Sequence, residues 1–303
     1  MLRKTYVIEN AATLRYNQDS IHIITQNGAD YCRALDDADS IIIDHSQVTI
    51  STPLLQALAD RQIDLVICDE KHIPCGIYLP LHGHTMMGYR TRLQAEAPKP
   101  LCKNLWKVTI QSKINNQALA LKAYGMESSY LSRLQNKVKS GDSKNTEAMA
   151  AAYYWKHFFL DEDNNDNPFT REPSGLPPNN LLNFGYAVLR SMCARYLIAA
   201  GLWPIYGIHH HNRYNSFPLA DDIMEPYRPM VDIMVKQIWQ NYPSIESISS
   251  EIKSELLSIH TMDVLQDGFR RPLQVSMQHT CSSLAKAFET KNISDLKYPT
   301  LIL

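Results

Sequence analysis

The sequence predicts an α+β protein, with a β-rich, sandwich-like N-terminal domain followed by a larger all-α C-terminal domain. Up to about residue 84 the chain is a series of short β-like runs, separated by turn signals such as Asn27-Gly28. Beyond the segment "EAPKP", which ends at Pro100, apolar residues recur with a period of about 3.6. A chain of 303 residues is long enough for two domains. We therefore expect domains at 1–84 and 101–303, joined by a linker at 85–100.

One helix is expected within the β-rich half. In "STPLLQALADRQ", Ser51 or Thr52 can cap a helix, Pro53 suits its first turn, and leucines follow at helical spacing. The strands are expected in "KTYVIEN", "ATLRYN", "SIHIITQ", "SIIIDHSQVTI", "IDLVICDE" and "IPCGIYLPL".

Long helical patterns fill the C-terminal two thirds. They include "LWKVTIQSKINNQALALKAYG", "TEAMAAAYYWKHFF", "LLNFGYAVLRSMCARYLIAAG" and "PMVDIMVKQIWQ". A polar, proline-rich segment at 161–180 separates two of these helices and is too long for a plain connection. We expect this loop to be mobile unless a partner orders it.

Charge is unevenly distributed along a chain whose formal net charge is only -1. Eight basic residues and two acidic ones lie between Leu101 and Lys144, which gives this segment a net charge of +6. Such a segment can bind phosphates, although a solvated helix surface is the simpler interpretation. The candidate DNA-binding residues are Lys103, Lys107, Lys113, Arg133, Lys137 and Lys139.

The six cysteines form no C-x-x-C pair, which argues against a zinc ribbon and against a disulfide scaffold. We expect free, buried thiols. The N-terminus lacks the apolar region of a signal peptide, and no run reaches the roughly 18 apolar residues of a membrane span. These features predict a cytoplasmic protein without a membrane partner.

A candidate metal site lies in "GIHHHNRYNSFPLADDIMEP", where three histidines precede Asp222 and Glu225. On a helix, Asp222, Glu225 and Asp232 fall on one edge, opposite an apolar edge. Pro226 predicts a bend or restart near Glu225. Carboxylates with an imidazole suit Mg²⁺ or Mn²⁺ better than structural zinc. The alternative is a surface ion pair between these acids and Arg228.

A third ligand is plausible at Glu147 in "GDSKNTEAMAAAYYW". This glutamate lies near a predicted helix start, where the positive end of the helix dipole favours a carboxylate. The alanines that follow allow close approach of another helix or of DNA. Glutamates are also common in first turns without any further role.

Taken together, these segments resemble one family, the CRISPR-associated endonuclease Cas1, which is the integrase of CRISPR adaptation. The resemblance runs along nearly the whole chain, through "TPLLQALADRQIDLVICDE", "KINNQA", "TEAMAAAYYW" and "NNLLNFGYAVLR", to a glycine and histidine followed by "DDIMEPYRPMVD". The last block is the most specific. The length and wording of these blocks are most similar to versions from type II CRISPR systems.

The resemblance implies a function and a set of site residues. Glu147, His210 and Glu225 match the catalytic metal ligands, with His209 and His211 as alternative registers for the histidine. Asp222 matches a supporting acid, and Asn183, Tyr186 and Arg228 match positions near the site. The implied reaction joins 3′-hydroxyl ends of captured double-stranded DNA to the CRISPR repeat, with Mg²⁺ or Mn²⁺. The implied assembly is a homodimer through the β-rich half, two of which flank a Cas2 dimer in a heterohexamer.

Three alternatives stay open. Asp69-Glu70-Lys71, with Asp44 upstream, is similar to the acid-x-Lys element of restriction-type nucleases. A tyrosine-recombinase mechanism needs an Arg/His cluster around a tyrosine, which no spacing in the sequence indicates. A DNA-binding scaffold protein with the same fold and no catalysis is the non-enzymatic alternative.

Overall fold

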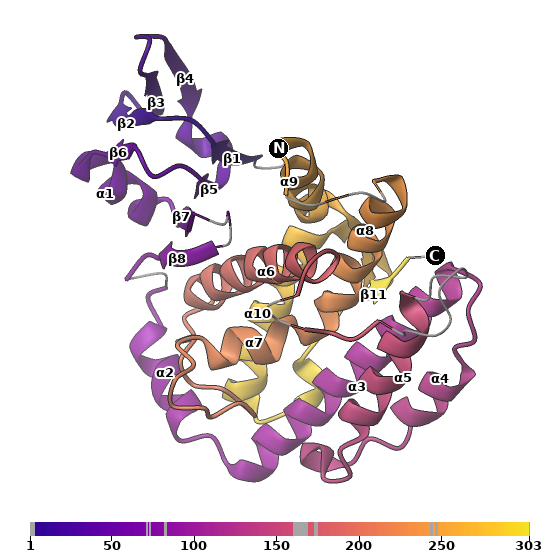
Figure 1. Ribbon diagram of the computed structural model, residues 1–303. Helices are drawn as coiled ribbons and strands as arrows, with labels where there is room; N and C mark the ends of the chain where they lie inside the picture. Colours follow the sequence, from indigo (N-terminus) through magenta and orange to yellow (C-terminus); the bar gives the residue numbers. More distant parts are fainter. Residues whose placement is uncertain are drawn as a thin grey trace. The chain divides into compact units, whose positions relative to one another are not determined.

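The computed structural model of the chain divides into two compact units, Met1–Met87 and Gly88–Leu303 (Figure 1). It describes residues 4–70, 72, 74–81, 84–159, 169–172, 175–242, 245 and 248–302. The first unit is built mainly from strands and the second mainly from helices, which confirms the predicted α+β class. Each unit is described by itself below.

The described residues of the N-terminal unit form two four-stranded sheets, the 3₁₀ turn η1 (Leu35–Asp37) and one α-helix. One sheet has the order β1-β5-β7-β8, in which β8 is antiparallel to β7 and the other pairs are parallel. The other sheet has the order β4-β3-β2-β6, in which only β6 pairs in parallel. The strands are β1 (Lys4–Ile8), β2 (Ala12–Asn17), β3 (Ser20–Thr25), β4 (Asp30–Ala34), β5 (Ala38–Ile43), β6 (Val48–Ile50), β7 (Asp64–Cys68) and β8 (Pro74–Tyr78).

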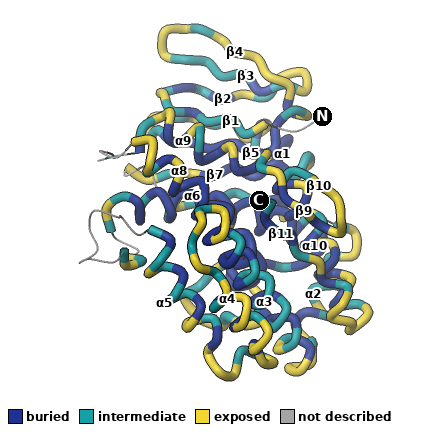
Figure 2. The backbone as a smooth tube through the Cα atoms, turned by 90° about the vertical axis from the view of Figure 1, so that its right-hand side faces the viewer, coloured by how far each residue is buried: buried dark blue, intermediate teal, exposed yellow. Residues whose placement is uncertain are grey.

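The core of this unit is apolar. It is made of aliphatic side chains from both sheets and from helix α1 (Thr52–Asp60), among them Leu14, Ile21, Ile41, Leu54, Leu58 and Leu65. Strand β4 is exposed along its whole length (Figure 2). The turn between β3 and β4 contains Asn27 and Gly28, and Gly28 has a φ of 83° that favours glycine.

The helix predicted in the N-terminal half is confirmed. Ser51 occupies the N-cap position of α1, and Pro53 lies in its first turn. The Ser51 side chain makes no capping hydrogen bond, so the start of α1 depends on the proline and on the leucines it buries.

Helices dominate the second unit, and three of them position the candidate site. Helix α3 is the longest at 25 residues, α5 packs beside it, and α6 is buried along most of its length (Figure 1). The α-helices are α2 (Met87–Ala95), α3 (Lys99–Ala123), α4 (Ser129–Gln135), α5 (Thr146–Phe158), α6 (Asn179–Ala199), α7 (Pro218–Met224), α8 (Arg228–Asn241), α9 (Ser250–Leu257) and α10 (Leu273–Thr290). Short 3₁₀ turns include η2 (Ser140–Asp142) and η3 (Glu225–Tyr227).

The prediction that this unit is all-α is wrong in one place. An antiparallel sheet of order β10-β9-β11 joins β9 (Asp263–Gln266), β10 (Phe269–Pro272) and β11 (Thr300–Leu301). Asp267 and Gly268 connect β9 to β10 with φ values of 52° and 79°, as a two-residue hairpin of the Asp-Gly type requires. This turn signal is visible in the sequence, but it lies between two helical patterns that conceal it.

The expected linker at 85–100 and the expected loop at 161–180 both overlap helices. Helix α2 occupies much of the segment 85–100 expected as a linker. Of the loop expected at 161–180, residues 161–168 and 173–174 lie outside the described residues, and α6 already begins at Asn179. No helix in the described ranges is long and apolar enough to cross a membrane. The cysteines are free as expected, but only Cys193 and Cys281 are buried.

Candidate functional site

Two of the predicted ligands, Glu147 and Glu225, meet at one lysine of helix α3. The Nζ atom of Lys113 lies 2.6 Å from Glu147 Oε1 and 2.7 Å from Glu225 Oε2. Glu147 is in the first turn of α5, and Glu225 begins η3, between α7 and α8. Three segments far apart in the sequence therefore bring two carboxylates to a single cation.

The start of α5 fixes the position of Glu147. The carboxylate of Asp142, in η2, accepts hydrogen bonds from the backbone N–H groups of Thr146 at 2.8 Å and Glu147 at 2.9 Å. Asn145, just before the helix, has a left-handed φ of 53° that turns the chain into α5. Asp142 thus satisfies two unpaired donors at the helix start and places Glu147 where the helix dipole favours a negative charge.

Glu225 is a buried charge held by two cations. Its side chain is 6% exposed; Arg228 Nη2 lies 3.0 Å from Oε1, and Lys113 Nζ lies close to Oε2. Burial alone would raise the pKa of this carboxyl, but Arg228 and Lys113 outweigh burial and lower the pKa below its ordinary value. Arg228 is the expected partner, but Glu225 is buried, so this pair differs from an ordinary surface ion pair.

The predicted bend or restart near Glu225 is confirmed as a restart, because α7 ends at Met224, η3 follows and α8 begins at Arg228. Asn116 of α3 holds η3 in place. Its Nδ2 donates to the carbonyl oxygens of Pro226 at 2.7 Å and Pro299 at 3.1 Å, and its Oδ1 accepts from the N–H of Leu301 at 3.1 Å. Asn116 lies within "KINNQA", but the sequence did not identify it as a site residue, since its partners are more than 100 positions away.

Asp222 organises the histidine loop, the segment that contains His209, His210 and His211. This fully buried carboxylate accepts hydrogen bonds from the N–H groups of Ile208, His209 and His210 at 2.7, 2.9 and 3.2 Å. It also lies 2.5 Å from Nδ1 of the His210 ring. A Cβ atom on Gly207 would lie 2.3 Å from the carbonyl oxygen of His210, so only glycine permits this close turn.

The three neighbouring histidines have different surroundings. His209 stacks on Trp106 of α3, with ring centroids 4.1 Å apart and an interplanar angle of 1°. His210 alone among the three has its ring bound to Asp222, which leaves its Nε2 for another partner. His211 is exposed. The geometry therefore favours His210 over its neighbours as a ligand.

These surroundings shift the histidine pKa values in opposite directions. The hydrogen bond to Asp222 is the main reason that the pKa of His210 lies above its ordinary value. Partial desolvation of its ring is the main reason that the pKa of His209 lies below it. Glu147 and Glu225 both contribute to raising the pKa of His210, so the imidazole senses both carboxylates.

Tyr186 and Asn183 connect the site to a second buried network. The Tyr186 hydroxyl donates to Asp232, whose other oxygen accepts from Tyr154 at 3.0 Å. Burial raises the pKa of Asp232 to about 7. The Tyr186 ring lies beneath two guanidinium groups: that of Arg228 at 4.8 Å, and that of Arg171 at 5.5 Å, which also donates to Asn183 Oδ1.

The donor set fits a hard divalent cation. It offers two carboxylates, one of them the buried Glu225, and an imidazole oriented by Asp222. As placed, no three His, Cys, Asp or Glu side chains of the described residues are grouped closely enough to hold a metal ion. The ammonium of Lys113 lies between the two carboxylates.

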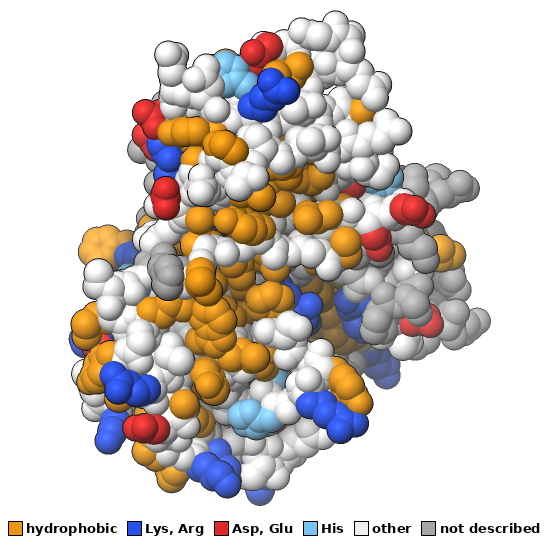
Figure 3. Space-filling model, turned by 90° about the vertical axis from the view of Figure 1, so that its left-hand side faces the viewer, with side chains coloured by type: hydrophobic (Ala, Val, Ile, Leu, Met, Phe, Trp, Pro, Cys, Tyr) orange, Lys and Arg blue, Asp and Glu red, His pale blue; other side chains and the backbone are white. Residues whose placement is uncertain are grey.

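Lys113 therefore differs from the surface DNA-binding residue expected there, since its side chain is only 12% exposed. Lys103, Arg133, Lys137 and Lys139 are exposed, and Lys107 is half-buried. On the face drawn in Figure 3, Lys and Arg side chains stand in small separate groups among abundant hydrophobic ones.

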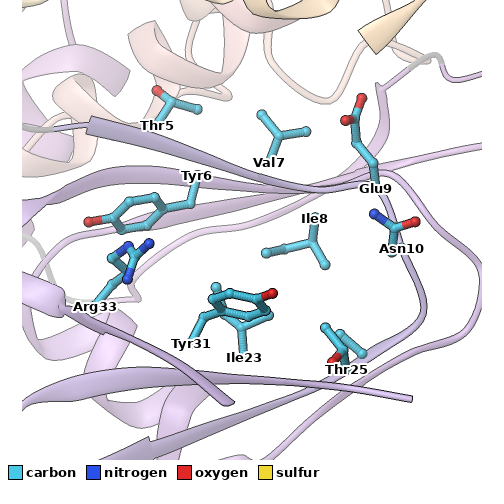
Figure 4. Close-up of a pocket in the computed structure, with 11 residues that line it drawn as sticks. Thr5, Tyr6, Val7, Ile8, Glu9, Asn10, Ile23, Thr25, Tyr31 and Arg33 are labelled. Carbon is cyan, nitrogen blue, oxygen red and sulfur yellow. The ribbon is translucent and has the colours of Figure 1, made fainter. Parts of the chain in front are cut away.

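The pocket described for the N-terminal unit has few side chains suited to catalysis or metal binding. A pocket of about 330 Å³ is lined by β1, β3 and β4, where Ile8, Ile23 and Tyr31 lie on one side of β1 (Figure 4). Its lining contains one carboxylate and no histidine or cysteine. In the alternative acid-x-Lys element, Asp44 pairs with His72 at 2.9 Å. Lys71 lies outside the described residues.

Comparison with known protein families gives a match over most of the chain. The family described as CRISPR associated protein Cas1 matches residues 5–244. The CRISPR-associated endonuclease Cas1 of Neisseria meningitidis serogroup C (strain 8013) is 32% identical over 304 residues, which cover 100% of this chain and 97% of that protein. CRISPR-associated endonuclease Cas1 2 of Pyrobaculum aerophilum is 26% identical, covering 84% and 89% of the two chains.

Solved structures share the fold at lower sequence identity. A casposase bound to integration product superposes with a TM-score of 0.78 at 17% identity, covering 96% of this chain and 92% of that chain. A CAS1 protein from Thermotoga maritima gives 0.75 at 17% identity, with coverage of 94% and 97%. A chain of a Cas6-RT-Cas1–Cas2 complex gives 0.75 at 19% identity, covering 97% of this chain and 36% of that chain.

Proposed function

This chain belongs to the family of CRISPR-associated protein Cas1, and from that premise we propose that it is a DNA endonuclease and integrase of CRISPR adaptation. In the proposed reaction, the 3′-hydroxyl of a captured DNA fragment attacks a phosphodiester of the repeat. One phosphodiester bond forms as another breaks, and a 3′-hydroxyl leaves. With water as the attacking group, the same site would cut DNA.

One observation carries the proposal: Glu147 and Glu225 share Lys113, and both carboxylates help to raise the pKa of the Asp222-bound His210. Each of the three is fixed by its local structure: Glu147 by the Asp142 cap, Glu225 by η3 and His210 by the Asp222 carboxylate. Side chains fixed in this way are typical of catalytic centres, because a preorganised site does not have to rearrange during the reaction.

We propose that Glu147, His210 and Glu225 hold Mg²⁺ or Mn²⁺. When bound, the ion would supply Lewis-acid chemistry that lowers the pKa of the attacking hydroxyl and stabilises charge on the phosphodiester. Asp222 keeps the His210 Nδ1 engaged, so that Nε2 is the ligand atom. Arg228 stays paired with Glu225 Oε1, and Tyr186 packs against its guanidinium to keep it in place.

The proposed partners are double-stranded DNA, a second copy of the chain and Cas2. Support for DNA comes from the exposed basic residues of the segment 101–144 and from the similar casposase, whose solved structure is bound to integration product. Support for Cas2 comes from the similar chain of the Cas6-RT-Cas1–Cas2 complex, which includes Cas2. The arrangement we propose is a homodimer formed through the β-rich units, with two such dimers flanking a central Cas2 dimer in a heterohexamer.

The test is strand transfer on a labelled branched DNA with Mn²⁺ or Mg²⁺, using His210→Ala and the matched control His211→Ala. We expect joined product from the wild type and from His211→Ala. We expect a loss of about a hundredfold or more from His210→Ala, and no product with EDTA.

The alternative proposal, a DNA-binding scaffold, predicts a different result. A scaffold would bind the DNA equally well with chelator and would yield no joined product, even when Cas2 is supplied. Product that survives in His210→Ala but disappears in His209→Ala would move the ligand to the neighbouring residue. A covalent protein–DNA adduct would revive the tyrosine-recombinase mechanism.

A further inference from the structure

Lys113 makes the charges of the site balance. Two carboxylates, Glu147 and Glu225, face two cations, Lys113 and Arg228, at distances of 2.6 to 3.0 Å. Charges in a buried site are stable only when they are paired. A divalent ion added to this cluster would create an excess of two positive charges, and the departure of one cation would reduce that excess to one. The ion and the Lys113 ammonium therefore compete for the same two carboxylates.

Geometry indicates which cation would leave. Arg228 holds Glu225 Oε1 at 3.0 Å and is also fixed by its contact with the Tyr186 ring. Lys113 contacts Glu225 Oε2 at 2.7 Å and Glu147 Oε1 at 2.6 Å, so its ammonium occupies the space that the two carboxylates share. A lysine side chain can swing away on its flexible stem, whereas a stacked guanidinium is held more firmly. Glu225 Oε2 is thus the oxygen that an ion can take, and Lys113 is the group it must replace.

We propose that Lys113 is a displaceable internal cation, which holds Glu147 and Glu225 together before a divalent ion binds and must leave the carboxylates when the ion arrives. Lys113 is then a positioning residue that sets the affinity of the site for metal. This inference rests on the proposed metal site. It assigns Lys113 a role that its charge alone did not indicate, because the sequence grouped it with the surface lysines.

Removing the lysine should raise metal affinity and lower stability without metal. In Lys113→Met the side chain stays unbranched and is one atom shorter, and the two carboxylates lose their shared cation. Leaving buried charges unpaired is costly, and a divalent ion would relieve that cost. We expect Mn²⁺ to bind about tenfold more tightly to Lys113→Met than to the wild type. We also expect a lower melting temperature without metal, which Mn²⁺ restores.

The experiment is calorimetric titration of the full chain with Mn²⁺, together with thermal melting followed by circular dichroism. Lys122→Met is the matched control, because Lys122 is an exposed lysine of the same helix. It should bind Mn²⁺ as the wild type does. Should Lys113→Met not fold, Lys113→Gln keeps an N–H donor for Glu147, and its affinity ratio decides the question in the same way.

The outcomes separate this inference from the proposed function. Wild-type protein that binds Mn²⁺, while the Lys113 variant binds it equally or more weakly, overturns the displacement and leaves the metal site intact. Failure of every variant to bind Mn²⁺ overturns the metal site, and the displacement with it. Binding that appears only in the Lys113 variant supports displacement, and shows that the wild-type site needs a further component to take up metal.

Discussion

The two units of this chain differ in which charged groups they bury. The interior of the N-terminal unit is a cluster of aliphatic side chains from two sheets and α1, and the charged residues buried in this unit are the aspartates Asp39, Asp44 and Asp64 among the residues that the structure describes. In the helical unit, fully or nearly fully buried residues include Asp222, Glu225, Asp232 and Lys236. Apolar burial stabilises a fold without regard to pH, whereas buried charges stabilise it only while every partner is present. The comparison teaches that the helical unit holds buried charges at the site where chemistry is proposed, and that these charges destabilise the fold if they lose their partners.

The largest expected effect is that of Asp222→Ala. This change leaves the N–H groups of Ile208, His209 and His210 without their acceptor, at about 1–3 kcal/mol for each buried donor. We expect the free energy of unfolding to fall by about 4 to 6 kcal/mol and strand transfer to be lost. Urea unfolding followed by circular dichroism measures the first effect.

Asp221→Ala is the matched control for this change. Asp221 is also buried, but its partner Arg190 is 47% exposed, so water can replace the lost contact. We expect a loss of about 1 kcal/mol. Equal losses from the two neighbouring aspartates would contradict the special role of Asp222 and weaken the contrast between the units.

A smaller effect should appear as a pH dependence at Asp232. Its pKa is raised to about 7 by burial, from about 4 in an unfolded chain, so its protonated form is favoured in the folded state. Its contribution to stability is therefore complete below about pH 4 and is lost as the pH rises through 7. Asp232→Asn has no titrating carboxyl at this position, so its stability lacks this pH-dependent contribution.

We expect the stability of the wild type relative to Asp232→Asn to fall by about 3 kcal/mol between about pH 5 and about pH 8. Urea unfolding of both proteins at the two pH values measures the difference, in which all other titrating groups cancel. A relative stability that rises with pH would mean that Asp232 is ionised in the folded protein, with Arg228 and Arg171 outweighing burial.

The smallest effect is expected in the apolar core of the N-terminal unit. Ile41→Val removes one methylene from a fully buried side chain of β5 and should cost about 1 kcal/mol at any pH. Ile67→Val, on the neighbouring strand β7 where the side chain is 43% exposed, should cost much less. Denaturant unfolding at two pH values tests both variants. A pH-dependent loss at Ile41 would show that the two units do not differ in the way described above.

Much of the architecture was predictable because local signals were strong. The helix at α1, the restart near Glu225 and the helix start at Glu147 all follow from prolines, capping positions and apolar periodicity. The β9–β10 hairpin also had a local signal, in Asp267-Gly268, but the surrounding helical patterns concealed it. The helix α2 was missed within the expected linker 85–100, since it has little apolar periodicity.

The site was predictable in composition but not in its connections. The resemblance to the Cas1 family identified Glu147, His210 and Glu225 as candidate metal ligands. It could not show that Lys113 lies between the carboxylates, because charge in a sequence carries no distance. Nor could it show that Asn116 holds Pro226 and Leu301, since such long-range contacts depend on the packing of whole helices.

The stack of Trp106 on His209 gives the site an optical reporter. The indole is fully buried and parallel to an imidazole that adjoins His210, and all four tryptophans belong to the helical unit. A movement of the histidine loop therefore changes the surroundings of one fluorophore. The emission of Trp106, isolated by replacing the other three tryptophans, would follow events at His210 in real time without any label on protein or DNA.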